Sequence, residues 1–238
     1  MNIGILGYGR MGREVEKLAQ KMGHTISAVF DIDKPFSTSA DMKNSNVLID
    51  FTLADAVINN LKIAAQLGIP VVEGTTGWYG KLDEMKAIKN LSIIYSPNFS
   101  IGVYQFTRIA EYAAKLMGTL PDYDCYLHEF HHTGKADSPS GTAKNLADIL
   151  IANLPSKKTA LYDTSHGKIP PDALHVTSTR TGRIPGTHEI GFDSPYDFIE
   201  LKHVNHNREG LAYGSIRAAE WIVGKSGIYT MNDFMKSL

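Results

Sequence analysis

The chain has 238 residues, 43% hydrophobic and 21% charged, with a formal net charge of -1 and an isoelectric point near 6.8. Such a composition is typical of a globular protein with one large or two small domains, and it gives no electrostatic reason to expect nucleic acid or an anionic membrane as a partner. A single cysteine, Cys125, excludes an internal disulfide, and the chain has neither a secretory signal nor a run of about 18 apolar residues that predicts a membrane span, so we expect a cytoplasmic protein.

The start of the chain has the pattern of a strand, a glycine turn and a helix. An apolar run at residues 3–6 ends in the turn, and apolar residues then recur at helical spacing over residues 11–22. In this setting the glycines allow a tight turn and a close approach of backbone to the pyrophosphate of a dinucleotide. The candidate cofactor-binding residues of the turn are Gly7, Tyr8, Gly9, Arg10, Met11 and Gly12. The alternative is a plain strand-to-helix turn without a ligand.

A second predicted strand, residues 26–30, ends at Asp31, which lies about twenty residues beyond the glycines. An acidic side chain at this place accepts hydrogen bonds from an adenosine ribose. No arginine stands beside Asp31 to balance a ribose 2′-phosphate, so the sequence favours NADH over NADPH. Lys34, or a residue distant in sequence, could still supply that positive charge.

Further strands at residues 47–51, 69–72 and 91–95, with a helix at residues 54–67, continue the alternation of strand and helix. This order predicts a parallel sheet whose ligands lie beyond the carboxyl ends of the strands. Two polar loops at such ends are therefore candidate cofactor-binding segments, namely Gly74, Thr75 and Thr76, and Ser96, Pro97, Asn98 and Phe99. The ring of Phe99 could cover a nicotinamide face or be an ordinary core side chain.

The pattern changes near residue 101, where we place a domain boundary. Helices at residues 103–117 and 140–153, a strand at residues 123–129 and later strands at residues 173–180, 188–193 and 196–204 predict an α+β domain with a mixed or antiparallel sheet. We therefore expect an α/β protein in which a Rossmann-like parallel-sheet domain, residues 1–101, is joined by a C-terminal helix within residues 209–238. The second domain occupies residues 102–208.

The central segment concentrates ionisable side chains. His131, His132 and Lys135 lie in a predicted loop that leads to the helix at residue 140, and adjacent loop histidines point to different sides and can have different roles. Free backbone N–H groups at the start of that helix attract anions, and the candidates there are Ser140, Gly141 and Thr142. The segment thus predicts a locally cationic site for a small dicarboxylate.

Two other interpretations of this segment stay open. The histidines could satisfy loop carbonyls while Lys135 is a solvated surface charge. A metal site would draw on His131, His132, Glu129 and Asp137, but the chain has neither a helical His-Glu-x-x-His spacing nor paired cysteines, so we expect no metal.

Residues 129–143 also resemble a known family. They read Glu-Phe-His-His-Thr-Gly-Lys-Ala-Asp-Ser-Pro-Ser-Gly-Thr-Ala, similar to the signature of the 4-hydroxy-tetrahydrodipicolinate reductases of bacterial diaminopimelate and lysine synthesis. Shorter motifs at residues 10–13, 50–52, 74–77 and 98–100 are similar to cofactor-domain motifs of that family in the same order. The resemblance therefore spans nearly the whole chain.

The resemblance implies NAD(P)H-dependent reduction of 4-hydroxy-tetrahydrodipicolinate to tetrahydrodipicolinate. It implies that His131 is a proton donor or acceptor, that Lys135 is a proton donor, and that His132 with the backbone of Gly141 and Thr142 holds the substrate carboxylates. It also implies a homotetramer formed by the substrate-binding domain. Some members have Glu-Arg where this chain has Asp31 and Ile32, which again favours NADH.

Two rival functions share some of these features. Another nicotinamide-dependent dehydrogenase of an amino or oxo diacid, of the aspartate-dehydrogenase type, would have the same cofactor domain but leaves the central segment unexplained. A non-catalytic dinucleotide sensor would not turn over NADH and would tolerate the loss of His131.

Overall fold

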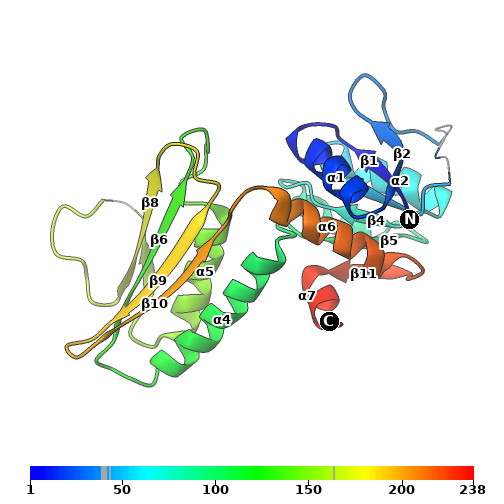
Figure 1. The fold of residues 1–238 in the computed structure, drawn as a ribbon. Helices are drawn as coiled ribbons and strands as arrows, with labels where there is room; N and C mark the ends of the chain where they lie inside the picture. Colours follow the sequence, from blue (N-terminus) through cyan, green and yellow to red (C-terminus); the bar gives the residue numbers. More distant parts are fainter. Residues whose placement is uncertain (39–41, 43, 163) are drawn as a thin grey trace. The chain divides into compact units, whose positions relative to one another are not determined.

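The computed structural model describes residues 1–38, 42, 44–162 and 164–238. The chain forms two compact units, the first made of Met1–Ile101 with Arg208–Leu238 and the second of Gly102–Asn207 (Figure 1). Among the described helices, none has the length and apolar character needed to cross a membrane.

The first unit is built on a parallel sheet of six strands in the order β11-β5-β4-β3-β1-β2. Their bounds are β1 (Asn2–Leu6), β2 (Thr25–Phe30), β3 (Val47–Asp50), β4 (Val71–Glu73), β5 (Ser92–Tyr95) and β11 (Gly227–Thr230). The central strands β3 and β4 are buried along their whole length because both faces of the sheet are covered. Since every pair is parallel, the carboxyl ends of all six strands lie along one edge.

Helices cover both faces of this sheet. The helices are α1 (Arg10–Lys21), α2 (Val57–Leu67), the 3-10 turn η1 (Tyr79–Lys81), α3 (Leu82–Lys86), α6 (Glu209–Ile222) and α7 (Met231–Met235). α1 packs against α6, and α6 lies against β3, β4 and β5. α2 and α3 bury Leu61 and Met85 in a cluster with Leu48 and Val71 of the sheet. The last thirty residues thus complete the unit that the first hundred begin.

The second unit contains a mixed sheet of five strands in the order β10-β9-β6-β8-β7. Its elements are α4 (Ile101–Met117), β6 (Asp124–His131), α5 (Gly141–Asn153), β7 (Thr159–Leu161), β8 (Ala173–Arg180), β9 (Thr187–Asp193) and β10 (Phe198–Val204). The central strand β6 pairs parallel with β8 and antiparallel with β9. α4 and α5 cover one face, where their apolar residues pack on Leu127, Val176 and Ile190 (Figure 1).

The two faces of this second sheet differ in chemistry. Along β6, Leu127, Glu129 and His131 point toward the helices and are buried, whereas the alternating side chains on the opposite face are half-buried. On that opposite face the rings of Tyr126 and Phe198 stack with centroids 6.3 Å apart. Toward its end, the helix-facing side of β6 therefore changes from apolar to ionisable residues.

The predicted fold class is confirmed, with corrections to individual elements. β6 continues to His131, which pairs in register with Arg180, so His131 lies on a strand and not in the predicted loop. Residues 209–238 form α6, β11 and α7, where a single helix was expected. β11 is stabilised by pairing with β5, and α7 begins at a capping box formed by Thr230 and Asp233.

Candidate active site

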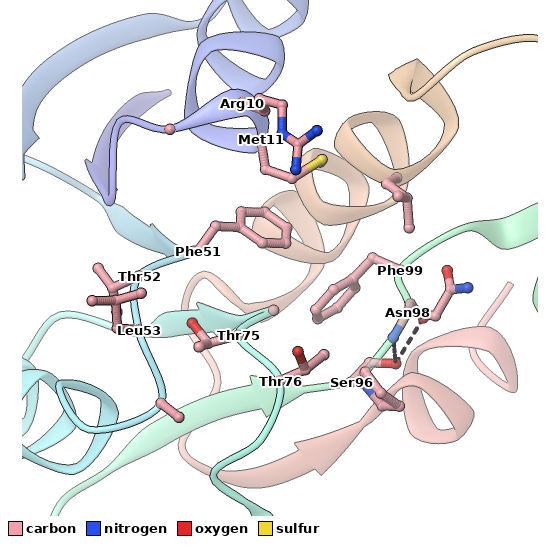
Figure 2. Close-up of a pocket in the computed structure, with 15 residues that line it drawn as sticks. Arg10, Met11, Phe51, Thr52, Leu53, Thr75, Thr76, Ser96, Asn98 and Phe99 are labelled. Carbon is pink, nitrogen blue, oxygen red and sulfur yellow. Dashed lines mark hydrogen bonds between the residues drawn. The ribbon is translucent and has the colours of Figure 1, made fainter. Parts of the chain in front are cut away.

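Loops at the carboxyl ends of the first sheet surround a pocket of about 530 Å³. Ten of the candidate cofactor-binding residues line it: Gly9, Arg10, Met11, Gly74, Thr75, Thr76, Ser96, Pro97, Asn98 and Phe99. Figure 2 shows these loops converging from the ends of β1, β4 and β5. The pocket therefore lies where a parallel α/β sheet binds its ligands.

The pocket has further lining residues that the sequence did not assign to it. Phe51, Thr52, Leu53 and Ala54 follow β3, and Leu211 comes from α6. The loop after β3 could have been found from the same end-of-strand rule that identified its two neighbours. Leu211 could not, since it is distant in sequence.

The remaining candidates of the glycine turn do not line the pocket but shape it. A Cβ atom added at Gly12 would lie 2.1 Å from the carbonyl oxygen of Gly7, so α1 can lie this close only with glycine there. Gly7 has a φ of 84°, which also favours glycine. The Tyr8 hydroxyl donates to Glu16, and the Arg13 guanidinium lies 5.1 Å from the centre of the Tyr8 ring.

Asp31 and Phe99 have contrasting surroundings. The Asp31 side chain is exposed at the end of β2, outside the residues that line the pocket, and its backbone pairs with Lys34. Phe99 is only 1% exposed, so its ring is largely a core side chain that also forms part of the pocket wall. Next to it, the Ser96 hydroxyl donates to the Asn98 carbonyl oxygen at 2.7 Å and shapes the loop (Figure 2).

Two buried carboxyl groups support the loops of this pocket. Asp50 and Glu73 are register partners at the ends of β3 and β4. The backbone N–H of Thr52 donates to Asp50 Oδ1 at 2.8 Å, and that of Thr75 donates to Glu73 Oε1 at 2.7 Å. Burial raises the pKa of both groups, and the charge of Asp50 raises the pKa of Glu73 further. The pair therefore retains a proton and fixes the backbone of two pocket loops.

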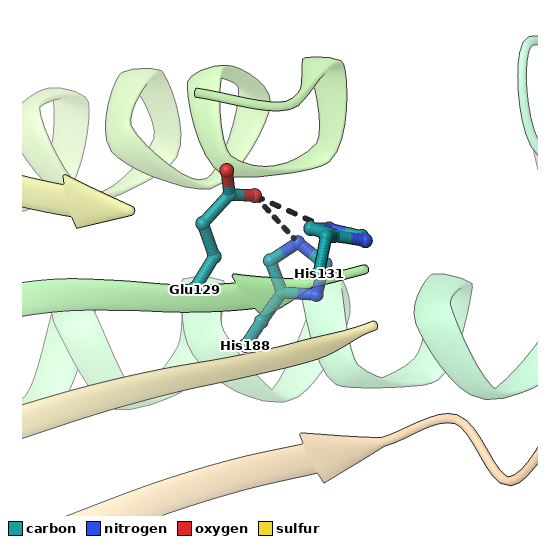
Figure 3. Close-up of side chains that lie close together, drawn as sticks. All are labelled: Glu129, His131 and His188. Atoms are coloured by element: carbon teal, nitrogen blue, oxygen red, sulfur yellow. Dashed lines mark ion pairs between the residues drawn. The ribbon is translucent and has the colours of Figure 1, made fainter. Parts of the chain in front are cut away.

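The second unit contains a cluster of ionisable side chains formed by Glu129, His131 and His188, which we call the histidine cluster (Figure 3). Glu129 and His131 share the helix-facing side of β6, and His188 comes from the adjacent β9. Glu129 Oε2 lies 3.4 Å from His131 Nε2 and 3.5 Å from His188 Nε2. All three residues are buried.

The other oxygen of Glu129 accepts three hydrogen bonds. Its donors are the backbone N–H of Ser140 at 2.9 Å, the Ser178 hydroxyl at 2.8 Å and Nη2 of Arg180 at 2.7 Å. Burial by itself would raise the pKa of Glu129, but the adjacent imidazoles of His131 and His188 and the hydrogen bonds from Ser140 and Arg180 outweigh it and lower the pKa well below its ordinary value. Glu129 is therefore a buried carboxylate anion beside two imidazoles.

Lys135 lies in the loop after β6, where its ammonium group is 2.6 Å from Asp137 Oδ1. Burial raises the pKa of Asp137, but bonding and charge from Lys135, with the backbone N–H of Gly141 contributing, lower it overall. The same Nη2 of Arg180 that bonds Glu129 also donates to the Asp137 carbonyl oxygen at 2.7 Å. This loop is thus anchored to β8 by Arg180.

The start of α5 is partly occupied by the protein itself. The N-terminal cap, Ser140, donates its N–H to Glu129, and its hydroxyl accepts from the Ala143 N–H at 3.1 Å. The polar groups of Ser140 therefore already have protein partners. This limits the direct contact with a substrate that was predicted for Ser140. Gly141 and Thr142 form the first turn beside it, and His132 is half-buried directly after β6.

The side chains of the histidine cluster are of the types that bind transition metals, and their ligand atoms lie within 4.8 Å of one another. The Arg180 guanidinium already balances the charge of Glu129, and Ser140 Oγ lies 3.3 Å from His188 Nε2. This environment favours a hydrogen-bonded cluster over a metal centre.

Sequence reasoning named Glu129 only as a possible metal ligand, and it missed the residues that surround this carboxylate, namely Ser178, Arg180 and His188. The period of two along β6 would have placed Glu129 on the same face as His131. Ser178, Arg180 and His188 come from strands whose pairing is decided by the tertiary fold, so their approach has no local signal in the sequence.

The chain matches two family models, described as "Dihydrodipicolinate reductase, N-terminus" over residues 1–99 and "Dihydrodipicolinate reductase, C-terminus" over residues 102–235. It is 38% identical to a 4-hydroxy-tetrahydrodipicolinate reductase of Christiangramia forsetii, with 100% of this chain and 99% of that protein aligned. It is also 38% identical to the reductase of the same name from Archaeoglobus fulgidus, with 96% of each covered.

Solved structures share the fold. The dipicolinate-bound dihydrodipicolinate reductase from Paenisporosarcina sp. TG-14 superposes with a TM-score of 0.75 over 98% of both chains, at 20% sequence identity. An engineered D-amino acid dehydrogenase bound to NADP+ superposes with a TM-score of 0.52 at 15% identity, over 97% of this chain and 93% of that one.

Proposed function

This chain belongs to the dihydrodipicolinate reductase family, and on that premise we propose which of its residues carry out the family's reaction. The reaction is the NAD(P)H-dependent reduction of 4-hydroxy-tetrahydrodipicolinate to tetrahydrodipicolinate in diaminopimelate and lysine biosynthesis, and this chain is an enzyme of that activity. The observation that carries the residue assignment is the buried histidine cluster beside the start of α5.

The nicotinamide cofactor belongs in the pocket of the first unit. Its backbone-rich loops suit a dinucleotide, with the N-terminus of α1 available to the pyrophosphate and Gly74, Thr75 and Thr76 to polar groups of the nicotinamide half. We assign Asp31 to the adenosine ribose and hence favour NADH. Lys34, whose ammonium group lies 5.3 Å from the centre of the Phe30 ring, is the nearby cation that would assist NADPH.

The substrate dicarboxylate binds in the second unit in this proposal. The N–H groups at the start of α5 attract carboxylates, as do His132 and the Lys135 ammonium group, and the N–H of Gly141 already acts on the Asp137 carboxylate. Gly141 and Thr142 would contact a carboxylate through their backbone, while Ser140 holds the turn in place. The Asp137 carboxylate now bonded to Lys135 would give way to a substrate carboxylate of the same charge.

His131 and Lys135 are the groups that handle protons. The overall reaction adds one hydride and one proton to the substrate and removes its 4-hydroxyl group as water. A nicotinamide held in the pocket would supply the hydride, and the negative charge that this leaves on the ring has to be neutralised by a proton. His131 is suited to give or take a proton because its imidazole is held 3.4 Å from the Glu129 carboxylate. Lys135 stabilises the developing charge and can also donate. General acid catalysis of this kind contributes about a hundred- to ten-thousandfold in rate.

We further propose that the chain forms a homotetramer through the helix-free face of the second sheet. That face carries the stacked pair of Tyr126 and Phe198, and Phe198 is 48% exposed. An aromatic sheet face of this kind is usually covered by another subunit. Sedimentation velocity tests the proposal, and a monomer at micromolar concentration would refute it.

For an enzyme of amino-acid biosynthesis we expect a cytoplasmic location, with neither nucleic acid nor membrane as a partner.

A coupled assay tests the proposed function. The condensation product of pyruvate and aspartate semialdehyde is generated in place, and oxidation of NADH and NADPH is followed separately. We expect turnover with this substrate and none with oxaloacetate plus ammonia, which an enzyme of the aspartate-dehydrogenase type would reduce. Turnover only with oxaloacetate, or with neither, would reject the proposal in favour of that dehydrogenase or of a sensor.

A further inference from the structure

Arg180 connects the two proposed catalytic groups through a single nitrogen. Its Nη2 donates to Glu129 Oε1 and to the carbonyl oxygen of Asp137, each at 2.7 Å. Glu129 faces His131, and the side chain of Asp137 bonds Lys135. The strand that carries His131 and the loop that carries Lys135 therefore share one anchor, which comes from β8.

The contacts of Glu129 show a division between its two oxygens. Oε1 accepts three hydrogen bonds, from Ser140, Ser178 and Arg180. Oε2 has no hydrogen bond of good geometry and is directed at the imidazoles of His131 and His188. One oxygen thus fixes the carboxylate in place, so that the other presents a negative charge at a fixed position beside His131.

The Cε1–Nδ1 edge of the His131 ring is also confined. A Cβ atom added at Gly186 would lie 2.9 Å from His131 Cε1 and 3.3 Å from Nδ1. The ring therefore has Glu129 Oε2 near its Nε2 and the Gly186 backbone near its other edge. Since neither side leaves room, the orientation of the ring depends on where Glu129 is held.

We propose that Arg180 is a positioning residue for the reaction. It holds Glu129 against His131, and it holds the Asp137 loop, which carries Lys135, beside these two residues. This inference rests on the proposed function, since it takes His131 and Lys135 as the proton-handling groups. A structural ion pair alone is a weak explanation, because burying Arg180 and Glu129 costs desolvation that an apolar pair would avoid. The ion pair of Arg180 and Glu129 is explained if it aligns the two catalytic groups, His131 and Lys135.

The test is the Arg180→Ala variant, assayed with and without millimolar guanidinium. Misplacing a catalytic group by about 1 Å can cost about a hundredfold in rate, so we expect kcat to fall by about that factor while KM for the substrate changes little. Added guanidinium should restore part of kcat, because it can occupy the vacated site and bond both Glu129 and Asp137. A purely structural role would not give this rescue in folded protein.

The matched control is Arg108→Ala, which removes an arginine paired with Glu111 at 2.7 Å on the exposed side of α4. It should keep wild-type kcat and show no response to guanidinium. Should Arg180→Ala fail to fold, Glu129→Gln replaces it; this variant keeps the side-chain shape, and we expect a similar loss of kcat that guanidinium does not restore.

Three results would overturn the inference while leaving the proposed function intact. One is wild-type kcat in Arg180→Ala, or in Glu129→Gln where that variant is used. A second is a rise in KM at unchanged kcat, which would make Arg180 a direct substrate ligand. A third is stoichiometric binding of Zn²⁺ by wild-type protein that is lost in His188→Gln, which would make the cluster a metal site. Failure of the proposed function is distinguishable, because the wild-type enzyme would then not turn over the substrate.

Discussion

The pocket loops of the first unit and the histidine cluster of the second both rest on carboxyl groups with no exposed surface, yet the protonation of these groups differs. Asp50 and Glu73 have neutral donors and each other as neighbours, and the pKa of each is raised, by burial first. Glu129 is as inaccessible, but Arg180 and two imidazoles face it, and its pKa is lowered. Burial alone therefore does not decide whether a carboxyl group is charged.

The difference matches the two tasks. In the proposed function the first unit holds a polyanionic cofactor, and the proton retained by the Asp50–Glu73 pair limits the negative charge beside the loops that bind it. In the same proposal the second unit moves a proton, and Glu129 places a carboxylate beside the imidazole of His131. Binding in one unit is thus supported by neutral hydrogen bonds, and chemistry in the other by charge.

The largest effect is expected in the histidine cluster, where the carboxyl group is charged. His131→Gln should lose most of kcat, by about a hundred- to ten-thousandfold, because the group paired with Glu129 no longer transfers a proton. Steady-state kinetics with the condensation product measures it. The control is His166→Gln, a change in an exposed loop, which should be neutral. A wild-type rate in His131→Gln would remove the assignment.

Lys135→Ala tests the second proton-handling group. We expect kcat to fall by about a hundredfold and KM for the substrate to rise, because the ammonium group both stabilises charge and attracts a carboxylate. Lys158→Ala, at an exposed lysine of the same unit, is the matched control. If both variants gave wild-type values of kcat and KM, Lys135 would be only a surface charge.

Glu73→Gln tests whether the carboxyl pair of the first unit retains a proton in the folded protein. Because the folded-state pKa of Glu73 is above its ordinary value, the wild-type protein is most stable relative to the variant at acidic pH and loses stability as pH rises toward that pKa. Between pH 5 and pH 8 the difference in the free energy of unfolding should therefore shift in favour of the variant. Urea denaturation at several pH values measures it, and parallel curves would show that Glu73 is not protonated in the folded state.

Asp31→Ala should give the smallest effect. Loss of the ribose hydrogen bonds should raise KM for NADH by about tenfold and KM for NADPH by less, since a 2′-phosphate gains from removal of the negative charge. Asp33→Ala, two residues further on, is the matched control. Equal changes for both cofactors would show that Asp31 does not select between them.

Local patterns were enough to predict the fold class and most of the pocket. The alternation of strand and helix, together with polar residues at strand ends, predicted Gly74, Thr75 and the Ser96 loop, and all of them line the pocket. Asp31 follows the same rule, yet it lies outside the pocket lining, because the rule describes where a strand ends and not which way its last side chain points.

The histidine cluster shows where sequence patterns stop being informative. His131 and Glu129 are visible as ionisable residues, but the position of His131 at the end of β6 depends on its pairing with Arg180 of β8. His188 joins them across an antiparallel pair in which it lies opposite Glu129. Such contacts follow from strand order, which no local spacing encodes.

The most direct test of the division between binding and chemistry measures both on one variant. His131→Gln is titrated with NADH by fluorescence, and its rate of NADH oxidation is then followed in a stopped-flow instrument after addition of the condensation product. We predict a Kd for NADH equal to that of wild type and a rate of hydride transfer reduced by at least about a hundredfold. An unchanged rate of hydride transfer, or a rate lost only because NADH no longer binds, would contradict the account.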